Sequence, residues 1–206
     1  GRMINKMRIP ESTLTREKVL EENKRVHKLE DRSYLDRHPE QTNFFQARIL
    51  KKTVNQVCSL IEPTKGDILE LGCGTGYLYL EFLKRGYKIT GVDLSTEMIN
   101  VLESRIPKNC EKRSKLVVSD VESFAEIGDK KYSAIIVSAL LHHLYDYESV
   151  IKMYCERLVS GGVFLIFFEP LKNWTPKLFK KQKDQSFQLK PSFSDQFSGI
   201  HLKLNL

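Results

Sequence analysis

Three glycines, Gly72, Gly74 and Gly76, separate a short apolar run from an amphipathic one in the segment ELGCGTGYLYLEFLKRG, residues 70–86. Glycine has no Cβ, so its backbone can turn tightly and approach a ligand where another residue would collide. The apolar run predicts a strand, and the segment after the glycines predicts a helix that ends at Gly86. A strand, a glycine turn and a helix in succession are typical of nucleotide-cofactor sites in α/β proteins.

The rest of the chain continues this alternation of strands and helices. Strands are predicted at residues 67–72, 87–94, 115–120, 132–140 and 163–170, and helices at residues 43–61, 77–85, 95–106 and 147–159. The unbroken apolar middle of 132–140 is typical of a strand buried on both faces. Short turns link these segments, so the sequence predicts an α/β fold with a doubly wound, mostly parallel sheet in three α/β/α layers.

Length and composition indicate a single globular unit. The 206 residues are 41% hydrophobic and 29% charged, which suits a soluble protein with one sizeable core. We find neither an apolar run of about 20 residues nor a signal peptide, and the four cysteines lie far apart. We therefore expect a cytoplasmic protein with reduced thiols, no membrane span and no metal site.

The positive charge lies on the flanks of the chain. The net charge of +7 divides into +5 over residues 1–60, −3 over 61–170 and +5 over 171–206. Basic flanks can bind nucleic acid, but a lysine-rich solvated surface is the simpler interpretation. Nucleic acid stays an alternative partner that the sequence does not favour.

The spacing of the glycines excludes two common cofactor loops. A dinucleotide fingerprint needs G-x-G-x-x-G/A, whereas here the third glycine comes one residue early and Tyr77 stands at the dinucleotide position. A Walker loop would close with GK[ST], and the segment has no such ending.

The run ELGCGTG instead resembles the glycine motif of class I S-adenosylmethionine-dependent methyltransferases. Asp93, at the end of the second predicted strand, matches the acidic residue that binds the ribose hydroxyls in that family. Asp120, at the end of the third, matches the residue that meets the adenine amino group. The segments ALLHHL and RLVSGGVFLI are similar to the end of the family's fourth strand and the glycine turn before its fifth. The resemblance covers about residues 66–169 and implies a Rossmann-like methyltransferase fold, S-adenosylmethionine as cofactor and S-adenosylhomocysteine as product.

The resemblance also implies a set of cofactor-binding residues. These are Tyr34, Glu70, Leu71, Gly72, Cys73, Gly74, Gly76, Tyr77, Asp93, Leu94, Met98, Asp120, Val121, Ser138 and Ala139. Glu70 matches an acid that orients the loop and the amino-acid end of the cofactor. Cys73 is interpreted as a small residue between glycines and not as a nucleophile. Tyr34 lies in the segment 1–62, which we expect to be a helical lid over the Rossmann-like domain formed by residues 63–206.

His142 and His143 are the candidate catalytic residues. Methyl transfer is an in-line displacement, so an enzyme can work chiefly by aligning acceptor and methyl group. A base is needed only where the acceptor must lose a proton. Both histidines follow the fourth predicted strand, where the family's pocket opens onto the methyl group. One of them, with a slight preference for His142, is the candidate base; the alternative is that one packs under the cofactor and the other faces solvent.

Three functions fit these motifs. The favoured one is methyl transfer to an oxygen, nitrogen or carbon of a small-molecule acceptor. The alternatives are an RNA methyltransferase that uses the basic flanks, and a non-catalytic cofactor-binding subunit that needs a partner.

The C-terminal region motivates the partner-dependent alternative. The family's sheet has two further strands, whereas the residues after Pro170 are rich in lysine and show little apolar alternation. We therefore predict a shortened strand region in which 200–206 pair beside the fifth strand and 172–190 cross the surface as a loose connection. A homodimer or a partner chain that covers the sheet edge is the alternative.

Overall fold

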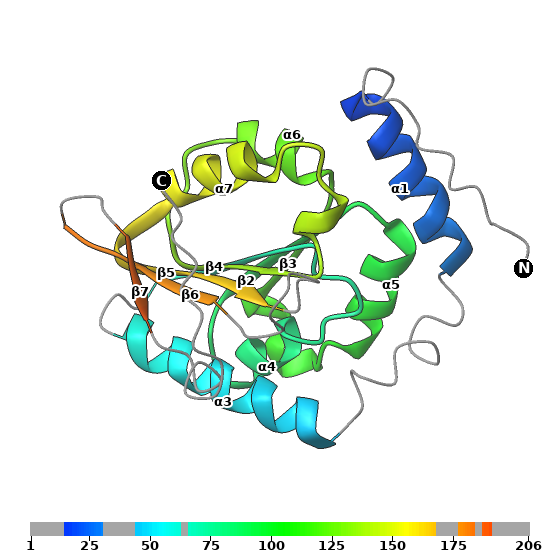
Figure 1. Ribbon diagram of the computed structural model, residues 1–206. Helices are drawn as coiled ribbons and strands as arrows, with labels where there is room; N and C mark the ends of the chain where they lie inside the picture. Colours follow the sequence, from blue (N-terminus) through cyan, green and yellow to red (C-terminus); the bar gives the residue numbers. More distant parts are fainter. Residues whose placement is uncertain (1–14, 31–43, 63–65, 168–176, 184–186, 191–206) are drawn as a thin grey trace, which may run out of the picture.

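The computed structural model describes residues 15–30, 44–62, 66–167, 177–183 and 187–190. Seven strands form one sheet in the order β3-β2-β1-β4-β5-β6-β7 (Figure 1). The strands are β1 (Ile68–Leu71), β2 (Ile89–Asp93), β3 (Ser114–Val118), β4 (Tyr132–Ser138), β5 (Leu158–Phe167), β6 (Lys177–Lys181) and β7 (Phe187–Lys190). Strands β1 to β5 are parallel, and β6 and β7 are antiparallel. The predicted fold class is confirmed.

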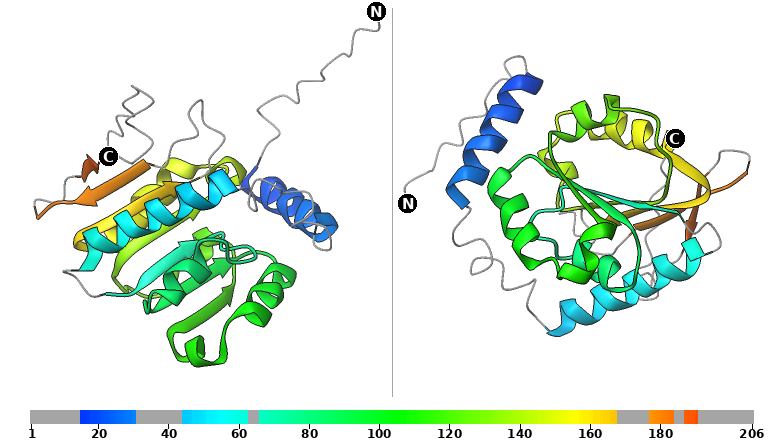
Figure 2. Two further views of the ribbon diagram at one scale, coloured as in Figure 1. Left: turned by 90° about the horizontal axis from the view of Figure 1, so that it is seen from below. Right: turned by 180° about the vertical axis from the view of Figure 1, so that it is seen from behind.

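Helices cover both faces of the sheet. They are α1 (Arg16–Glu30), α3 (Phe44–Ile61), α4 (Tyr79–Lys84), α5 (Thr96–Arg105), α6 (Val121–Glu126) and α7 (Tyr147–Glu156), with 3₁₀ turns η4 (Lys108–Arg113) and η5 (Leu141–His143). The helices α3, α4 and α5 pack on one face, and α6 and α7 on the other (Figure 1). Helix α1 lies outside these layers, beyond the end of the sheet (Figure 2). Within the described ranges, no helix has both the length and the apolar character needed to cross a bilayer.

Alternating strand residues divide the core into two halves. Ile68 of β1 packs with α3 and α4, whereas its neighbour Leu69 packs with α6 and α7, because successive side chains of a strand point to opposite faces. In β4 every residue from Tyr132 to Val137 is buried, as its unbroken apolar sequence predicts. Helix α3 packs on the sheet although it belongs to the predicted lid segment 1–62, and the boundary at residue 63 stays a prediction.

Strand β5 begins earlier than predicted. The sequence predicts a turn at Ser160-Gly161-Gly162 before the strand, but β5 already pairs with β4 at Leu158. The pairing then skips from Leu158 to Val163, so the two glycines form an irregularity inside the strand. Gly161 has a φ of 79°, a conformation that glycine adopts without strain and that sequence periodicity does not reveal.

The C-terminal prediction is wrong in its assignment of strands. Lys177–Lys181 form β6, which pairs antiparallel with β5, and β7 pairs with β6, so the described parts of 172–190 contain two strands of the sheet. Strand β6 therefore takes the place beside β5 that was predicted for 200–206, which lie outside the described residues. Both strands are short, and β6 has three lysines among its five residues, as is common near sheet edges, so neither gives a long run of apolar alternation.

Candidate functional site

One pocket, with a cavity volume of about 120 Å³, opens at the carboxyl ends of β1, β2, β3 and β4. Strand β1 lies between β2 and β4, so the chain changes direction across the sheet at this place. In open α/β sheets ligands bind at such a switch point. The pocket is lined by Arg16, Val19, Leu20, Asn23, Gly72, Gly74, Asp93, Leu94, Met98, Ser119, Asp120, Val121, Glu122, Ser138, Ala139, Leu140, His143, Leu144 and Tyr145.

The glycine turn after β1 needs its glycines for two different reasons. Gly74 has a φ of 47°, and a Cβ at this position would meet no atom within 4 Å, so its backbone faces open space in the pocket. Gly76 has a φ of 89°, and a Cβ there would lie 2.2 Å from Cδ1 of the buried Leu102. Gly74 thus exposes backbone to a ligand, whereas Gly76 lets the turn pack against α5.

Asp93 is held in place by two backbone amides. Its Oδ2 accepts a hydrogen bond from the Gly74 N–H at 2.7 Å, and its Oδ1 accepts one from the Ser95 N–H at 2.9 Å. An ionised carboxylate has about four acceptor positions, two on each oxygen. A carboxylate that is fixed in this way at the pocket lining suits a vicinal diol, which donates two hydrogen bonds.

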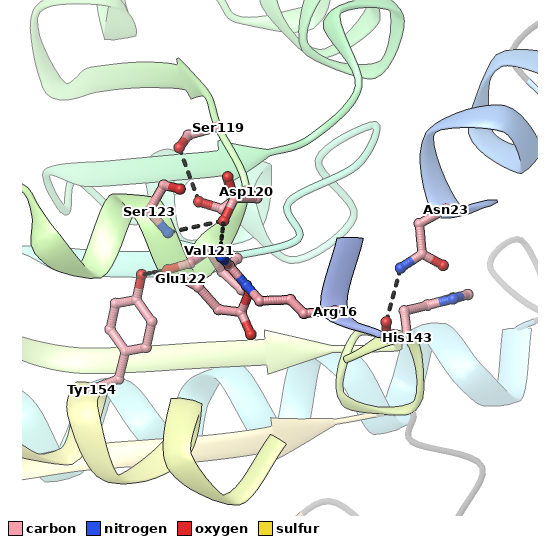
Figure 3. Close-up of polar contacts among 9 residues, drawn as sticks. All are labelled: Arg16, Asn23, Ser119, Asp120, Val121, Glu122, Ser123, His143 and Tyr154. Atoms are coloured by element: carbon pink, nitrogen blue, oxygen red, sulfur yellow. Dashed lines mark hydrogen bonds and ion pairs between the residues drawn. The ribbon is translucent and has the colours of Figure 1, made fainter. Parts of the chain in front are cut away.

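Asp120 caps α6 and also contacts α1. Its Oδ1 accepts a hydrogen bond from the Ser123 N–H at 2.9 Å, and the same oxygen lies 3.3 Å from Nη2 of Arg16 (Figure 3). Nε of Arg16 donates to Oε2 of Glu122. Partial burial alone would raise the pKa of Asp120, but the hydrogen bonds from Ser123 and the charge of Arg16 outweigh it and lower the pKa below its ordinary value.

Glu70, in β1, and Cys73, within the glycine turn, do not line the pocket. Glu70 is 2% exposed, and its Oε2 has no hydrogen-bond partner among the described residues. Burial, followed by the charge of Asp93, raises the pKa of Glu70 well above its ordinary value. Burial raises the pKa of Cys73 as well, which favours an inert thiol over a nucleophile.

The pocket brings together most of the residues that the sequence predicts for the site. Those on its lining are Gly72, Gly74, Asp93, Leu94, Met98, Asp120, Val121, Ser138, Ala139 and His143. Those away from it are Glu70, Leu71, Cys73, Gly76, Tyr77 and His142. Tyr34 lies outside the described residues.

The two histidines differ in position. His143 is half-buried and lines the pocket, whereas His142 is exposed and does not, although their ring centroids are only 4.0 Å apart. Both histidines belong to the 3₁₀ turn η5, but only His143 lines the pocket. The structure therefore favours His143 as the candidate base, whereas the sequence slightly favours His142.

Sequence reasoning missed the contribution of α1 to the pocket. Arg16, Val19, Leu20 and Asn23 recur at helical spacing and all line it. Nδ2 of Asn23 donates a hydrogen bond to the backbone carbonyl oxygen of His143 at 2.8 Å (Figure 3). The sequence predicts a helical lid in the segment 1–62, but the apolar periodicity of this charge-rich stretch is weak, and none of these four residues was among the predicted site residues.

Part of the chain is similar to known methyltransferases. Residues 68–162 match the model of a family described as a methyltransferase domain. The putative methyltransferase YqeM of Bacillus subtilis (strain 168) is 26% identical over 151 residues, which cover 68% of this chain and 59% of that protein. A ubiquinone biosynthesis O-methyltransferase of Photorhabdus laumondii is 32% identical over 105 residues, covering 48% and 41%. The chain thus spans about half the length of the curated relatives it matches.

A solved structure supports the fold. The crystal structure of monomeric WbdD is 19% identical with a TM-score of 0.51, and the match covers 59% of this chain and 32% of that one. At this identity the likeness speaks for the fold alone.

Proposed function

Residues 68–162 belong to the class I S-adenosylmethionine-dependent methyltransferases, and on that premise we propose that the chain transfers a methyl group to a small-molecule acceptor. Side chains from the ends of four neighbouring strands converge on one pocket, and this convergence carries the proposal. The product released with the methylated acceptor is S-adenosylhomocysteine. The two relatives described above are named as methyltransferases, one of them as putative, and the small-molecule acceptor is our proposal.

The described residues fit the proposed cofactor. Asp93 would accept the two ribose hydroxyls, because the Gly74 and Ser95 amides fix its carboxylate at the lining of the pocket. Asp120 would accept the adenine amino group on Oδ2, since its contacts with Ser123 and Arg16 both use Oδ1. Met98 and Val121 supply apolar surface beside these carboxylates for the purine ring.

The chemistry needs alignment first and a proton acceptor second. When bound, S-adenosylmethionine supplies a methyl carbon to which an acceptor lone pair bonds as the carbon–sulfur bond breaks and its electron pair stays on sulfur. The pocket walls would hold the acceptor for this in-line displacement and exclude water. His143, which lines the pocket, would accept the proton that a hydroxyl or protonated-amine acceptor loses and would pass that proton to solvent.

Titration calorimetry tests this proposal. We expect S-adenosylhomocysteine to bind while NAD and ATP give no heat of binding. Asp93→Ala removes the paired acceptor for the ribose and should weaken binding by about 1.5–3 kcal/mol, or about 10–150-fold. Asp129→Ala, at an exposed loop carboxylate, is the matched control and should bind as the parent does. The site assignment fails if Asp93→Ala, checked as folded by circular dichroism, binds S-adenosylhomocysteine with parental affinity.

A further inference from the structure

Several lining residues of the pocket have no role in the proposed cofactor site, and we call them its second part. They come from α1 and from the segment around the turn η5, and they are Val19, Leu20, Asn23, Leu140, His143, Leu144 and Tyr145. Of this group, the sequence predicts a site role for His143 alone. The hydrogen bond from Asn23 to the carbonyl of His143 ties α1 to η5 across this part of the pocket (Figure 3).

One face of α1 is turned toward the pocket. Val19, Leu20 and Asn23 are half-buried, whereas residues 15–18, 21, 22, 24 and 25 are exposed. Val19 and Leu20 belong to neither core cluster of the sheet. Both line the pocket, so they present aliphatic surface to whatever enters it.

The carboxylates and the guanidinium group on the lining already form ion pairs or hydrogen bonds within the protein. Arg16 pairs with Asp120 and Glu122, and Asp93 accepts hydrogen bonds from two backbone amides. Asp93 and Asp120 are also the residues that the proposed function assigns to the cofactor. A charged group that entered beside Val19 and Leu20 would lose water and meet mainly aliphatic carbon, which is costly.

We propose that this second part is the acceptor compartment and that it takes an uncharged, predominantly apolar small molecule. Val19 and Leu20 of α1 determine this specificity by forming the wall opposite Leu140 and Leu144. The inference rests on the proposed function, because an acceptor needs the cofactor in the neighbouring part of the same pocket. Tyr145, 56% exposed at the rim, offers a ring face to the entering molecule.

The test uses three probes that share a hydroxyphenyl ring and differ at the end of the side chain. These are 4-propylphenol, which is neutral, tyramine, which is cationic, and 4-hydroxyphenylacetate, which is anionic. Each is titrated into the full chain saturated with S-adenosylhomocysteine, and its affinity is measured by calorimetry or ligand-observed NMR. We expect 4-propylphenol to bind at least about tenfold more tightly than either charged probe.

The variant Leu20→Gln assigns the effect to α1. It should weaken 4-propylphenol binding about tenfold and change S-adenosylhomocysteine affinity less than twofold. Glu17→Gln, at an exposed position of the same helix, is the matched control and should change neither affinity.

Three results would overturn the inference while the proposed function stands. These are equal or tighter binding of a charged probe, binding of none of the three to protein that has taken up S-adenosylhomocysteine, and an equal loss of S-adenosylhomocysteine affinity in Leu20→Gln. The last result would mean that α1 covers the cofactor and not the acceptor. Failure of the parent protein to bind S-adenosylhomocysteine would instead remove the proposed function, and this inference with it.

Discussion

Nη2 of Arg16 lies 3.3 Å from Oδ1 of Asp120, although 104 residues separate them in the chain. With Asn23, which bonds to His143, Arg16 fastens α1 at two points across the mouth of the pocket (Figure 3). Both contacts of α1 are therefore with residues that line the candidate site. The docking of α1 should depend on these polar contacts and on what fills the pocket.

Arg16→Gln should loosen α1 without unfolding the domain. An exposed ion pair contributes about 0–1 kcal/mol, so we expect amide exchange in residues 15–30 to quicken by up to about fivefold while global stability barely changes. Hydrogen exchange followed by mass spectrometry measures this. Arg25→Gln, which breaks a pair with Glu22 inside the same helix, is the control. Identical exchange in the two variants would contradict the two-point attachment.

The two glycine positions of the turn should respond differently to alanine. Gly74→Ala introduces only backbone strain and should cost about 1–2 kcal/mol of unfolding free energy. Gly76→Ala adds a clash with Cδ1 of the buried Leu102, so this side chain must shift inside the core, and the variant should cost about 1–3 kcal/mol more. Urea denaturation of both variants gives the difference. Equal losses would show that Leu102 yields easily.

Glu70 should make the stability of the protein fall as pH rises. Its pKa is raised in the folded protein, so the folded state holds a proton that the unfolded state releases near the ordinary value of 4.5. The folded protein is thus favoured below that pH and loses stability, by at most about 1.4 kcal/mol per pH unit, as pH rises toward the folded pKa.

Glu70→Gln removes this titration. The variant should gain stability relative to the parent between about pH 5 and the folded pKa, and the gain should shrink below about pH 4.5, as measured by denaturation at a series of pH values. A constant difference between the two proteins across that range would mean that Glu70 is ionised and satisfied in the fold.

Lys181 should stabilise the junction between β6 and α7. Its side chain is buried, and Nζ donates hydrogen bonds to the carbonyl oxygens of Cys155 and Leu158, both at 3.2 Å. Lys181→Met keeps the apolar stem but leaves these carbonyls unsatisfied, which should cost about 1–3 kcal/mol of unfolding free energy. Lys180→Met, at the less buried neighbouring position, should cost less than about 0.5 kcal/mol. Similar losses in both variants would argue against this role.

Much of the site could be predicted because its signals are local. Asp93 and Asp120 each follow a strand whose apolar run is readable, and the carboxyl ends of parallel strands meet at one edge of the sheet. The resemblance to methyltransferases then supplied their proposed roles. Which of His142 and His143 lines the pocket could not be predicted in this way, because the direction of each side chain depends on the conformation of the turn η5.

The sequence by itself determined the alternation of strands and helices, the glycine turn and the strand-end carboxylates, since each depends on neighbours a few residues apart. Only the tertiary structure decided that Lys177–Lys181 form a strand and that α1 lines the pocket. Strand β6 forms because β5 offers it unpaired backbone groups, and α1 is placed by partners more than 100 residues away. Such contacts bring distant segments together through hydrogen bonding and burial, and no short stretch of sequence contains both partners.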